Sequence, residues 1–133
     1  RSGSNKGAKS DMCGIAKDLS ESDIQQVSEY YAGKAFVRIP QKFDEALAQR
    51  GKQIQSAKCN TCHSESGTLP GDDVGIVGGQ NMTYLTNTLK HFREGKRKLP
   101  KGMKQKIESL DDTEIEALIH FYGSVPDNWA FAK

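Results

Sequence analysis

Apolar side chains recur every three or four residues in several stretches of the chain, which is the period of an amphipathic α-helix. One stretch has Ser20 and Asp23 in a capping pattern at its start and Gly33 after its end. Another begins with the same kind of cap, made by Asp111 and Glu114. No stretch alternates as a strand would, so an all-α fold is predicted. The predicted helices cover about 21–32, 43–58, 81–94 and 112–122.

A five-residue motif, Cys59-Asn60-Thr61-Cys62-His63, follows the second predicted helix and spells C-x-x-C-H, the attachment signature of a c-type haem. Two thiols at this spacing can each add to one vinyl group, and the histidine then reaches the iron. A redox C-x-x-C would need a βαβ pattern around it, and a zinc site a second pair of ligands. The sequence therefore predicts one covalently attached haem c, held by Cys59 and Cys62, with His63 as an iron ligand.

A six-coordinate iron needs a second ligand opposite His63, and a methionine thioether suits an electron carrier because it favours reduced iron. The candidates are Met12, Met82 and Met103. Met82 is expected to pack in the protein or face solvent, and Met12 to reach the haem only by exchange between chains. Met103 is expected in an irregular loop rich in proline and glycine that folds over the far haem face, so the sequence favours Met103.

The remaining ring nitrogen of His63 needs a hydrogen-bond acceptor to fix the ring. A backbone carbonyl in the loop 69–76 is the expected acceptor, with Pro70 as one candidate. The other two histidines, His91 and His120, lie on polar or mixed helix faces and are expected at the surface rather than at the iron.

An internal repeat joins two segments at a fixed offset of 91 residues, from Met12 to Tyr31 and from Met103 to Tyr122. Any two amphipathic helices share some apolar positions, but a shared upstream methionine and matching caps favour a common origin. The first copy has no C-x-x-C-H before it. We therefore expect residues 1–42 to be a polar tail, a short helix and a linker from the end of a lost first haem domain, and residues 43–133 to be the cytochrome domain.

The composition fits a small protein built around a cofactor. Only 35% of the 133 residues are hydrophobic, and a haem would supply apolar surface that the side chains lack. The net charge of +2 would fall near zero with two propionates, which argues against nucleic acid as a partner. No run approaches the ~18 apolar residues of a transmembrane helix. The chain starts with Arg1 and shows no signal peptide, so we expect a mature or recombinant product. Haem attachment to C-x-x-C-H is made outside the cytoplasmic membrane, which points to the periplasm.

Two further features bear on partners. A basic segment over 90–106 flanks the favoured methionine and either steers an acidic partner to the haem edge or forms a solvated polar face. Cys13, the odd cysteine, is buried, free, or paired with Cys13 of a second chain, which leaves a disulfide-linked dimer open. The basic segment has one acid, Glu94, against Lys90, Arg93, Lys96, Arg97, Lys98, Lys101, Lys104 and Lys106.

With these residues placed, residues 43–124 resemble a class I cytochrome c. The Gly-Gly-Gln…Tyr-Leu…Phe-Arg-x-Gly pattern over 78–95 is similar to dihaem class I cytochromes. Residues 41–48 and the basic run before Met103 resemble the second haem domain of the cytochrome subunit of flavocytochrome c sulfide dehydrogenase. The chain departs from these patterns in having no earlier C-x-x-C-H and in having Gly75 where many class I cytochromes have proline.

This resemblance implies an all-α class I cytochrome c fold, with an extra N-terminal helix, and an electron carrier rather than an enzyme. It implies a redox protein partner, either a flavoprotein that donates electrons or an acidic carrier or oxidase. Cys59, Cys62, His63 and Met103 carry over as the haem residues, and a close helix crossing at Gly51 and Tyr122 is implied. The alternatives are a haem enzyme or gas sensor with an open iron position, and an accessory module of a larger complex.

Overall fold

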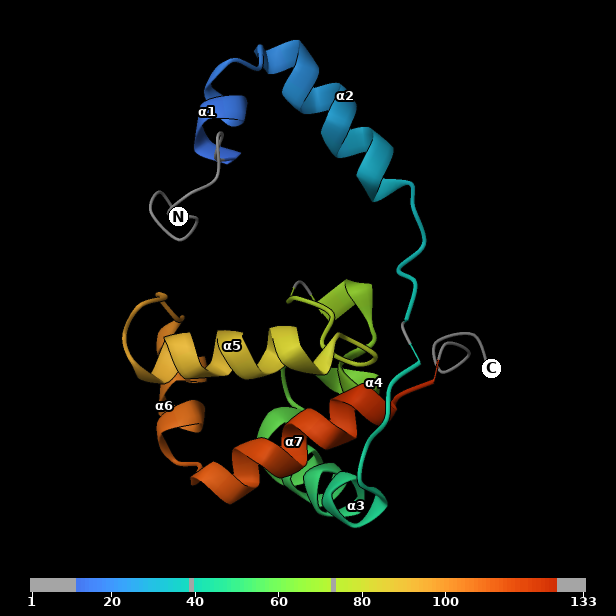
Figure 1. Cartoon of the computed structure of the whole chain (residues 1–133), viewed down its shortest axis with the longest axis vertical. Coiled ribbons are helices and arrows are strands. Elements are labelled where there is room, and N and C mark those ends of the chain that lie inside the picture. The colour runs from blue at the N-terminus through green and yellow to red at the C-terminus, as the bar shows by residue number, and fades with distance from the viewer. Residues whose placement is uncertain (1–11, 39, 73, 127–133) are drawn as a thin grey trace. The chain divides into compact units, whose positions relative to one another are not determined.

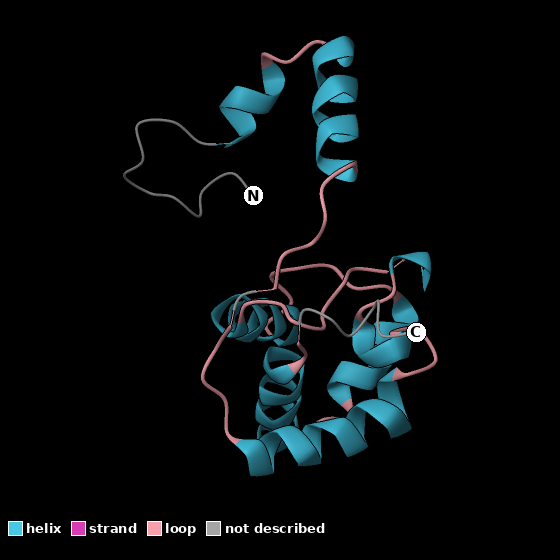
Figure 2. Ribbon diagram, turned by 90° about the vertical axis from the view of Figure 1, so that its right-hand side faces the viewer, coloured by secondary structure: helices cyan, strands magenta, loops and turns pink. Residues whose placement is uncertain are grey.

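The computed structural model describes residues 12–38, 40–72 and 74–126. Its elements are helices joined by loops, with no strand in those ranges, so the all-α prediction is confirmed (Figures 1 and 2). Contacts divide the chain after Phe36 into two units, and each is described by itself. None of the helices in the described ranges combines the length and apolar character needed to cross a membrane.

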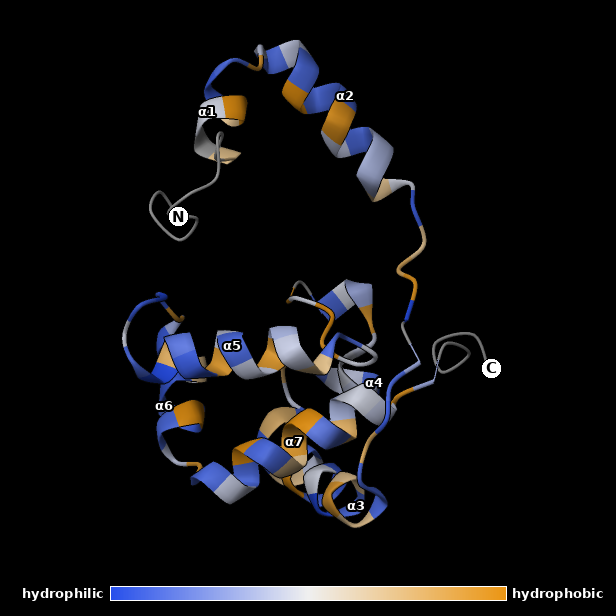
Figure 3. Cartoon of the chain, in the orientation of Figure 1, coloured by the Kyte–Doolittle hydropathy of each residue, from blue (hydrophilic) through white to orange (hydrophobic). Residues whose placement is uncertain are grey.

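The N-terminal unit contains α1 (Met12–Lys17) and α2 (Glu21–Ala32). The predicted capping box at the start of α2 is present, because the Asp23 amide donates to Ser20 Oγ at 3.2 Å and the Ser20 amide donates to Asp23 Oδ2 at 3.0 Å. No described residue of α2 is buried. The apolar positions of this helix, visible in Figure 3, therefore face solvent in this unit.

The second unit forms a helical domain in which α7 is central. Helix α3 crosses α7 and packs against it, and α5 packs against both α7 and α6 (Figure 1). The hydrophobic core is built mainly from α7, whose apolar positions are visible in Figure 3. In chain order the elements are α3 (Glu45–Ile54), the π-helical turn η1 (Gln55–Cys59), α4 (Ser64–Gly67), the 3-10 turn η2 (Pro70–Asp72), α5 (Met82–Arg93), α6 (Lys101–Glu108) and α7 (Asp112–Ser124).

The last helix confirms the second predicted cap. The Glu114 amide donates to Asp111 Oδ1 at 2.8 Å, and the Asp111 amide donates to Glu114 Oε2 at 3.1 Å. The start of α7 therefore repeats the start of α2 at the offset found in the sequence. The solvent exposure differs, since Ile115 is 8% exposed while its repeat partner Ile24 is 48% exposed.

One sequence expectation about secondary structure is wrong. The segment up to Met103 was expected to be a loop, but α6 begins at Lys101 and Met103 lies in its first turn. Pro100 precedes the helix, where its missing N–H costs no intrahelical bond. The second predicted helix, over about 43–58, is confirmed, because α3 covers Glu45–Ile54 and the π-helical turn η1 continues it to Cys59.

The segment before α3 packs on the second unit, although it was expected to be a connector. Gln41 Oε1 accepts from the Met82 amide at 2.7 Å, and Gln41 Nε2 donates to the Gln80 carbonyl at 3.0 Å. The buried Arg38 donates from Nε to the Gly78 carbonyl at 3.4 Å. These bonds fix the loop that leads into α5.

Candidate functional site

The C-x-x-C-H motif closes the wide turn that ends the first helix of the second unit. The Asn60 amide donates to the Gln55 carbonyl at 2.9 Å, five residues back, so one turn holds an additional residue. The chain then folds on itself, because the Cys62 and His63 amides both donate to the Cys59 carbonyl, at 3.2 and 2.9 Å. Such π-helical turns occur frequently at functional sites. The motif is thus presented at a helix end, as predicted.

The two motif cysteines have different environments. Cys59 is half-buried against the core and Cys62 is exposed, and both are free thiols. Burial raises the pKa of the Cys59 thiol, while the Tyr122 hydroxyl and the charges of Lys106 and Lys58 act in the opposite direction. A redox-active C-x-x-C instead has a lowered thiol pKa. The environment therefore does not favour disulfide chemistry at this pair.

His63 is half-buried, and its buried Nδ1 has no hydrogen-bond partner among the described residues. The expectation that a carbonyl in the loop 69–76 would accept from this ring is therefore wrong for Nδ1. Burial lowers the pKa of His63, and the charge of Asp72 acts in the opposite direction. The net effect favours the neutral imidazole, which is the form that binds a metal.

The backbone around His63 is held by two polar side chains that the sequence did not single out. Gln55 is 4% exposed, and its Nε2 donates to the His63 carbonyl at 2.7 Å. Asp72 accepts from the Ser64 amide at 2.8 Å and from the Ser64 hydroxyl at 2.7 Å. The only sequence signal for Gln55 was its spacing, which continues the buried face of α3 formed by Ala48 and Gly51. A polar residue occupies such a buried position only if it is hydrogen-bonded.

A left-handed turn follows the motif directly. Glu65, Ser66 and Gly67 have φ values of 47°, 63° and 72°. The Gly67 carbonyl then accepts from the Val77 and Gly78 amides at 2.9 and 3.0 Å, which closes the loop. Glu65 and Ser66 occupy a conformation that costs about 1–2 kcal/mol for a residue other than glycine. The strained turn thus lies directly after His63, the candidate iron ligand.

The three methionines lie in different places. Met103 is partly buried and packs against the same core cluster as Cys59. Met82, at the start of α5, packs so closely on Gly123 that a Cβ built there would lie 2.6 Å from the Met82 sulfur. Met12 is 71% exposed in the N-terminal unit. Met82 also packs against this core cluster, so what distinguishes Met103 is its place on α6, whose Lys106 acts on the Cys59 thiol.

The other expected residues were placed as follows. His91 is exposed, as expected. His120 is half-buried instead, and its Nδ1 accepts from the Asp44 amide at 2.9 Å. The helix crossing at Gly51 is present, and the atoms nearest a Cβ built there belong to Ala117 and Phe121. The Cys13 side chain and residues 1–10 lie outside the described residues, so the proposed dimer and the expected polar tail stay predictions.

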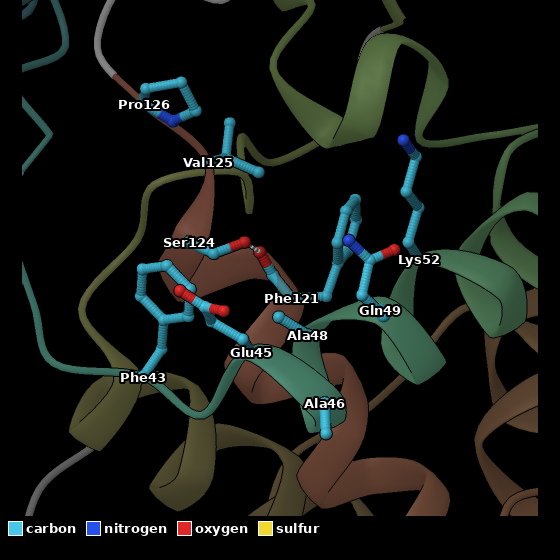
Figure 4. Close-up of a pocket in the computed structure, with 10 residues that line it drawn as sticks. All are labelled: Phe43, Glu45, Ala46, Ala48, Gln49, Lys52, Phe121, Ser124, Val125 and Pro126. Atoms are coloured by element: carbon cyan, nitrogen blue, oxygen red, sulfur yellow. Dashed lines mark hydrogen bonds between the residues drawn. The ribbon is translucent and has the colours of Figure 1, made fainter.

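Metal and ligand sites of other kinds are not formed by the described side chains. No three His, Cys, Asp or Glu side chains among them converge, as a protein-ligated zinc would require. An open groove of about 570 Å³ lies between α3 and the end of α7, away from the motif (Figure 4). It is lined by Phe43, Glu45, Ala46, Ala48, Gln49, Lys52, Phe121, Ser124, Val125 and Pro126.

The residues present fit a covalently attached haem. One thiol is half-buried beside the core and the other is exposed at the helix end, so two bonds can form without opening the domain. His63 is half-buried and its lowered pKa favours the neutral imidazole, which is the form that binds iron.

The chain is similar to known proteins over most of its length. The family model described as cytochrome C oxidase, cbb3-type, subunit III, matches residues 46–121. Cytochrome c4 of Pseudomonas aeruginosa is 30% identical over 129 residues, which covers 82% of this chain. The chain spans 61% of the length of that relative.

Proposed function

The chain belongs to the cytochrome c family, with covalently bound haem c and the all-α class I cytochrome c fold, and from this premise we propose that it is a one-electron carrier with a single haem. Cys59 and Cys62 would hold the haem covalently, and His63 and Met103 would bind its iron. Haem c, when bound, supplies an iron that gains and loses one electron. The family consists of electron carriers, and we extend that role to this chain as a His/Met-ligated carrier.

The ligand assignment is supported by two observations that separate Met103 from Met82, since both pack with Cys59 on the core cluster. The Met82 sulfur lies against Gly123, whereas Met103 lies on α6, whose Lys106 acts on the Cys59 thiol. His63 supports it, because its neutral imidazole is ready to bind iron without first losing a proton. Tyr122 is buried beside Cys59, and burial raises the pKa of its phenol. These side chains exclude water and hold both ligands in one arrangement, so the protein rearranges little when the electron moves.

The partner is a redox protein that docks through the basic segment around α6. Three of its cations already have partners, since Lys96 pairs with Glu94, Lys104 with Glu108 and Arg93 with Asp112. The remaining exposed lysines include Lys98 and Lys101 at the start of α6. They leave positive charge beside the helix that holds Met103, which suits an acidic partner such as an oxidase or a flavoprotein.

Location and origin follow from the same assignment. Haem attachment to C-x-x-C-H takes place outside the cytoplasmic membrane, so we place the protein in the periplasm. The repeat of α1–α2 in α6–α7, with two matching capping boxes, supports a shared origin of residues 1–42 with the end of a haem domain. Recovery of a flavoprotein with the tagged protein would favour an electron-transfer subunit over a free carrier.

The test compares two methionines by the same substitution. We expect M103L to abolish the far-red absorption band of a ferric methionine–haem bond, because leucine fills the space without a sulfur. The matched control, M82L, is expected to keep the band, because Met82 packs on Gly123. Loss of the band in M82L but not in M103L would move the ligand to Met82. A wild-type protein without the band would favour the open-site alternative, a haem enzyme or gas sensor.

A further inference from the structure

The peptide bond between His63 and Ser64 is held at both ends. Its carbonyl oxygen accepts from Gln55 Nε2 at 2.7 Å, and its N–H donates to Asp72 Oδ2 at 2.8 Å. One side chain comes from the π-helical turn before the motif and the other from the 3-10 turn after it. The two bonds fix the orientation of this peptide plane, and hence the backbone angle next to the His63 side chain.

Both side chains are themselves constrained. Gln55 is 4% exposed and also approaches Asn60 Oδ1 at 3.5 Å, inside the motif. Asp72 also accepts from the Ser64 hydroxyl, with 2.7 Å to each carboxylate oxygen. A buried amide with few alternative partners holds its acceptor more firmly than an exposed one, because breaking the bond leaves a polar group without water.

We call these two hydrogen bonds the Gln55–Asp72 clamp, and its role concerns the orientation of the His63 ring. A metal-ligating histidine almost always donates its other ring N–H to an acceptor, which fixes the ring. Among the described residues, the buried His63 Nδ1 has no such acceptor. The Gln55 and Asp72 bonds act instead on the backbone next to the ring.

We propose that Gln55 and Asp72 are positioning residues that orient the His63 imidazole toward the haem iron by clamping the His63–Ser64 peptide. The proposal rests on the proposed function, in which His63 is an axial ligand. Gln55 and Asp72 are not ligands and do not take part in electron transfer.

The experiment uses Q55L and D72A in the haem-loaded protein, with two readouts. Hydrogen exchange of the Ser64 amide reports the clamp, and the hyperfine shifts of the haem methyl groups in the ferric protein report the orientation of the imidazole plane. We expect faster exchange and an altered pattern of methyl shifts in both variants. The controls are Q53L, the same substitution at an exposed neighbour, and D72N, which keeps an acceptor for Ser64; both should resemble the wild type.

Wild-type methyl shifts in folded Q55L and D72A would overturn the proposal, even if exchange at Ser64 became faster. D72A changes a loop residue and carries the test alone if Q55L does not fold. A wild-type protein without histidine-ligated haem would instead refute the proposed function, and the visible spectrum distinguishes that result before any variant is made.

Discussion

Gly51 of α3 lies directly against the backbone carbonyl of Ala117 in α7, with no space for a side chain between the two helices. A Cβ at Gly51 would also lie 2.7 Å from the Phe121 Cβ. Neither atom belongs to a flexible side-chain end, so the helices would have to separate. This crossing brings the helix that carries the motif onto the core helix.

We therefore expect G51A to lower the free energy of unfolding by about 1–3 kcal/mol, the usual cost of overpacking. Urea denaturation of the haem-loaded protein measures the change. The control is G102A in α6, where a Cβ would meet nothing within 4 Å. That variant is expected to gain up to about 1 kcal/mol from helix propensity. Equal effects of the two substitutions would contradict the crossing.

The repeat provides a matched pair of apolar positions. Leu118 is 3% exposed in α7, and its repeat partner Val27 is 46% exposed in α2. We expect L118A to cost about 2–5 kcal/mol of stability, because it leaves a cavity in the core. V27A is expected to change stability by less than about 0.5 kcal/mol. Denaturation followed by haem absorbance measures both, and a large effect of V27A would mean that the apolar face of α2 is covered.

His120 joins the start of α3 to α7 through its bond from the Asp44 amide. We expect H120L to lower the free energy of unfolding by about 1 kcal/mol, the net worth of one hydrogen bond. H120Q keeps an acceptor on a side chain of similar reach and should recover part of the loss. Thermal unfolding of the wild type, H120L and H120Q at neutral pH measures these changes. An unchanged stability of H120L would mean that His120 is a surface residue that does not stabilise the fold.

The carboxylate of Glu114 connects the motif helix to the start of α7. It accepts from Lys58 Nζ at 2.9 Å and from the Asp111 amide, and these contacts lower its pKa from 4.5. Since folding lowers this pKa, the interaction stabilises the protein above the ordinary pKa and is lost as the pH falls below it. We expect E114Q to have a lower melting temperature at neutral pH and a smaller further loss on acidification. E116Q, at an exposed position of the same helix, should follow the wild type at every pH.

The basic segment predicts salt-dependent docking. We expect the double variant K98Q/K101Q to react several-fold more slowly with an acidic redox partner at low ionic strength, because two charges that steer the encounter are removed. High salt should bring its rate close to that of the wild type. The control is K52Q, which removes one charge from α3 beside the groove. A rate that does not depend on salt would remove the docking role.

The features that the sequence predicted correctly depend on residues close together in the chain. Ser20–Asp23 and Asp111–Glu114 are capping pairs three residues apart, so the pattern alone predicted both helix starts. Met103 was expected in a loop because Pro100 and Gly102 are loop-forming residues elsewhere, yet a proline just before a helix is compatible with it. The fold class, the motif and its helix were therefore predictable.

What could not be predicted depends on contacts between distant residues or on unusual backbone. Gln55 and Asp72 meet the same peptide from opposite sides of the motif, and no spacing rule connects them. Glu65 and Ser66 carry no residue-type signal for positive φ, because glycine and asparagine are the usual occupants of that region. The acceptor expected for His63 was inferred from a general rule about metal ligands, and the local backbone does not supply it.

The extra residue in the wide turn at 55–59 has a consequence for insertions and deletions. Each residue of an α-helix turns the chain by about 100°, so removing one from within 45–54 would rotate the thiols away from the side they now face. Removing Ser56 or Ala57 would instead tighten the wide turn into an ordinary one and leave that direction unchanged. The length of this helix is thus tolerant of a one-residue loss at one place only, directly ahead of the first cysteine.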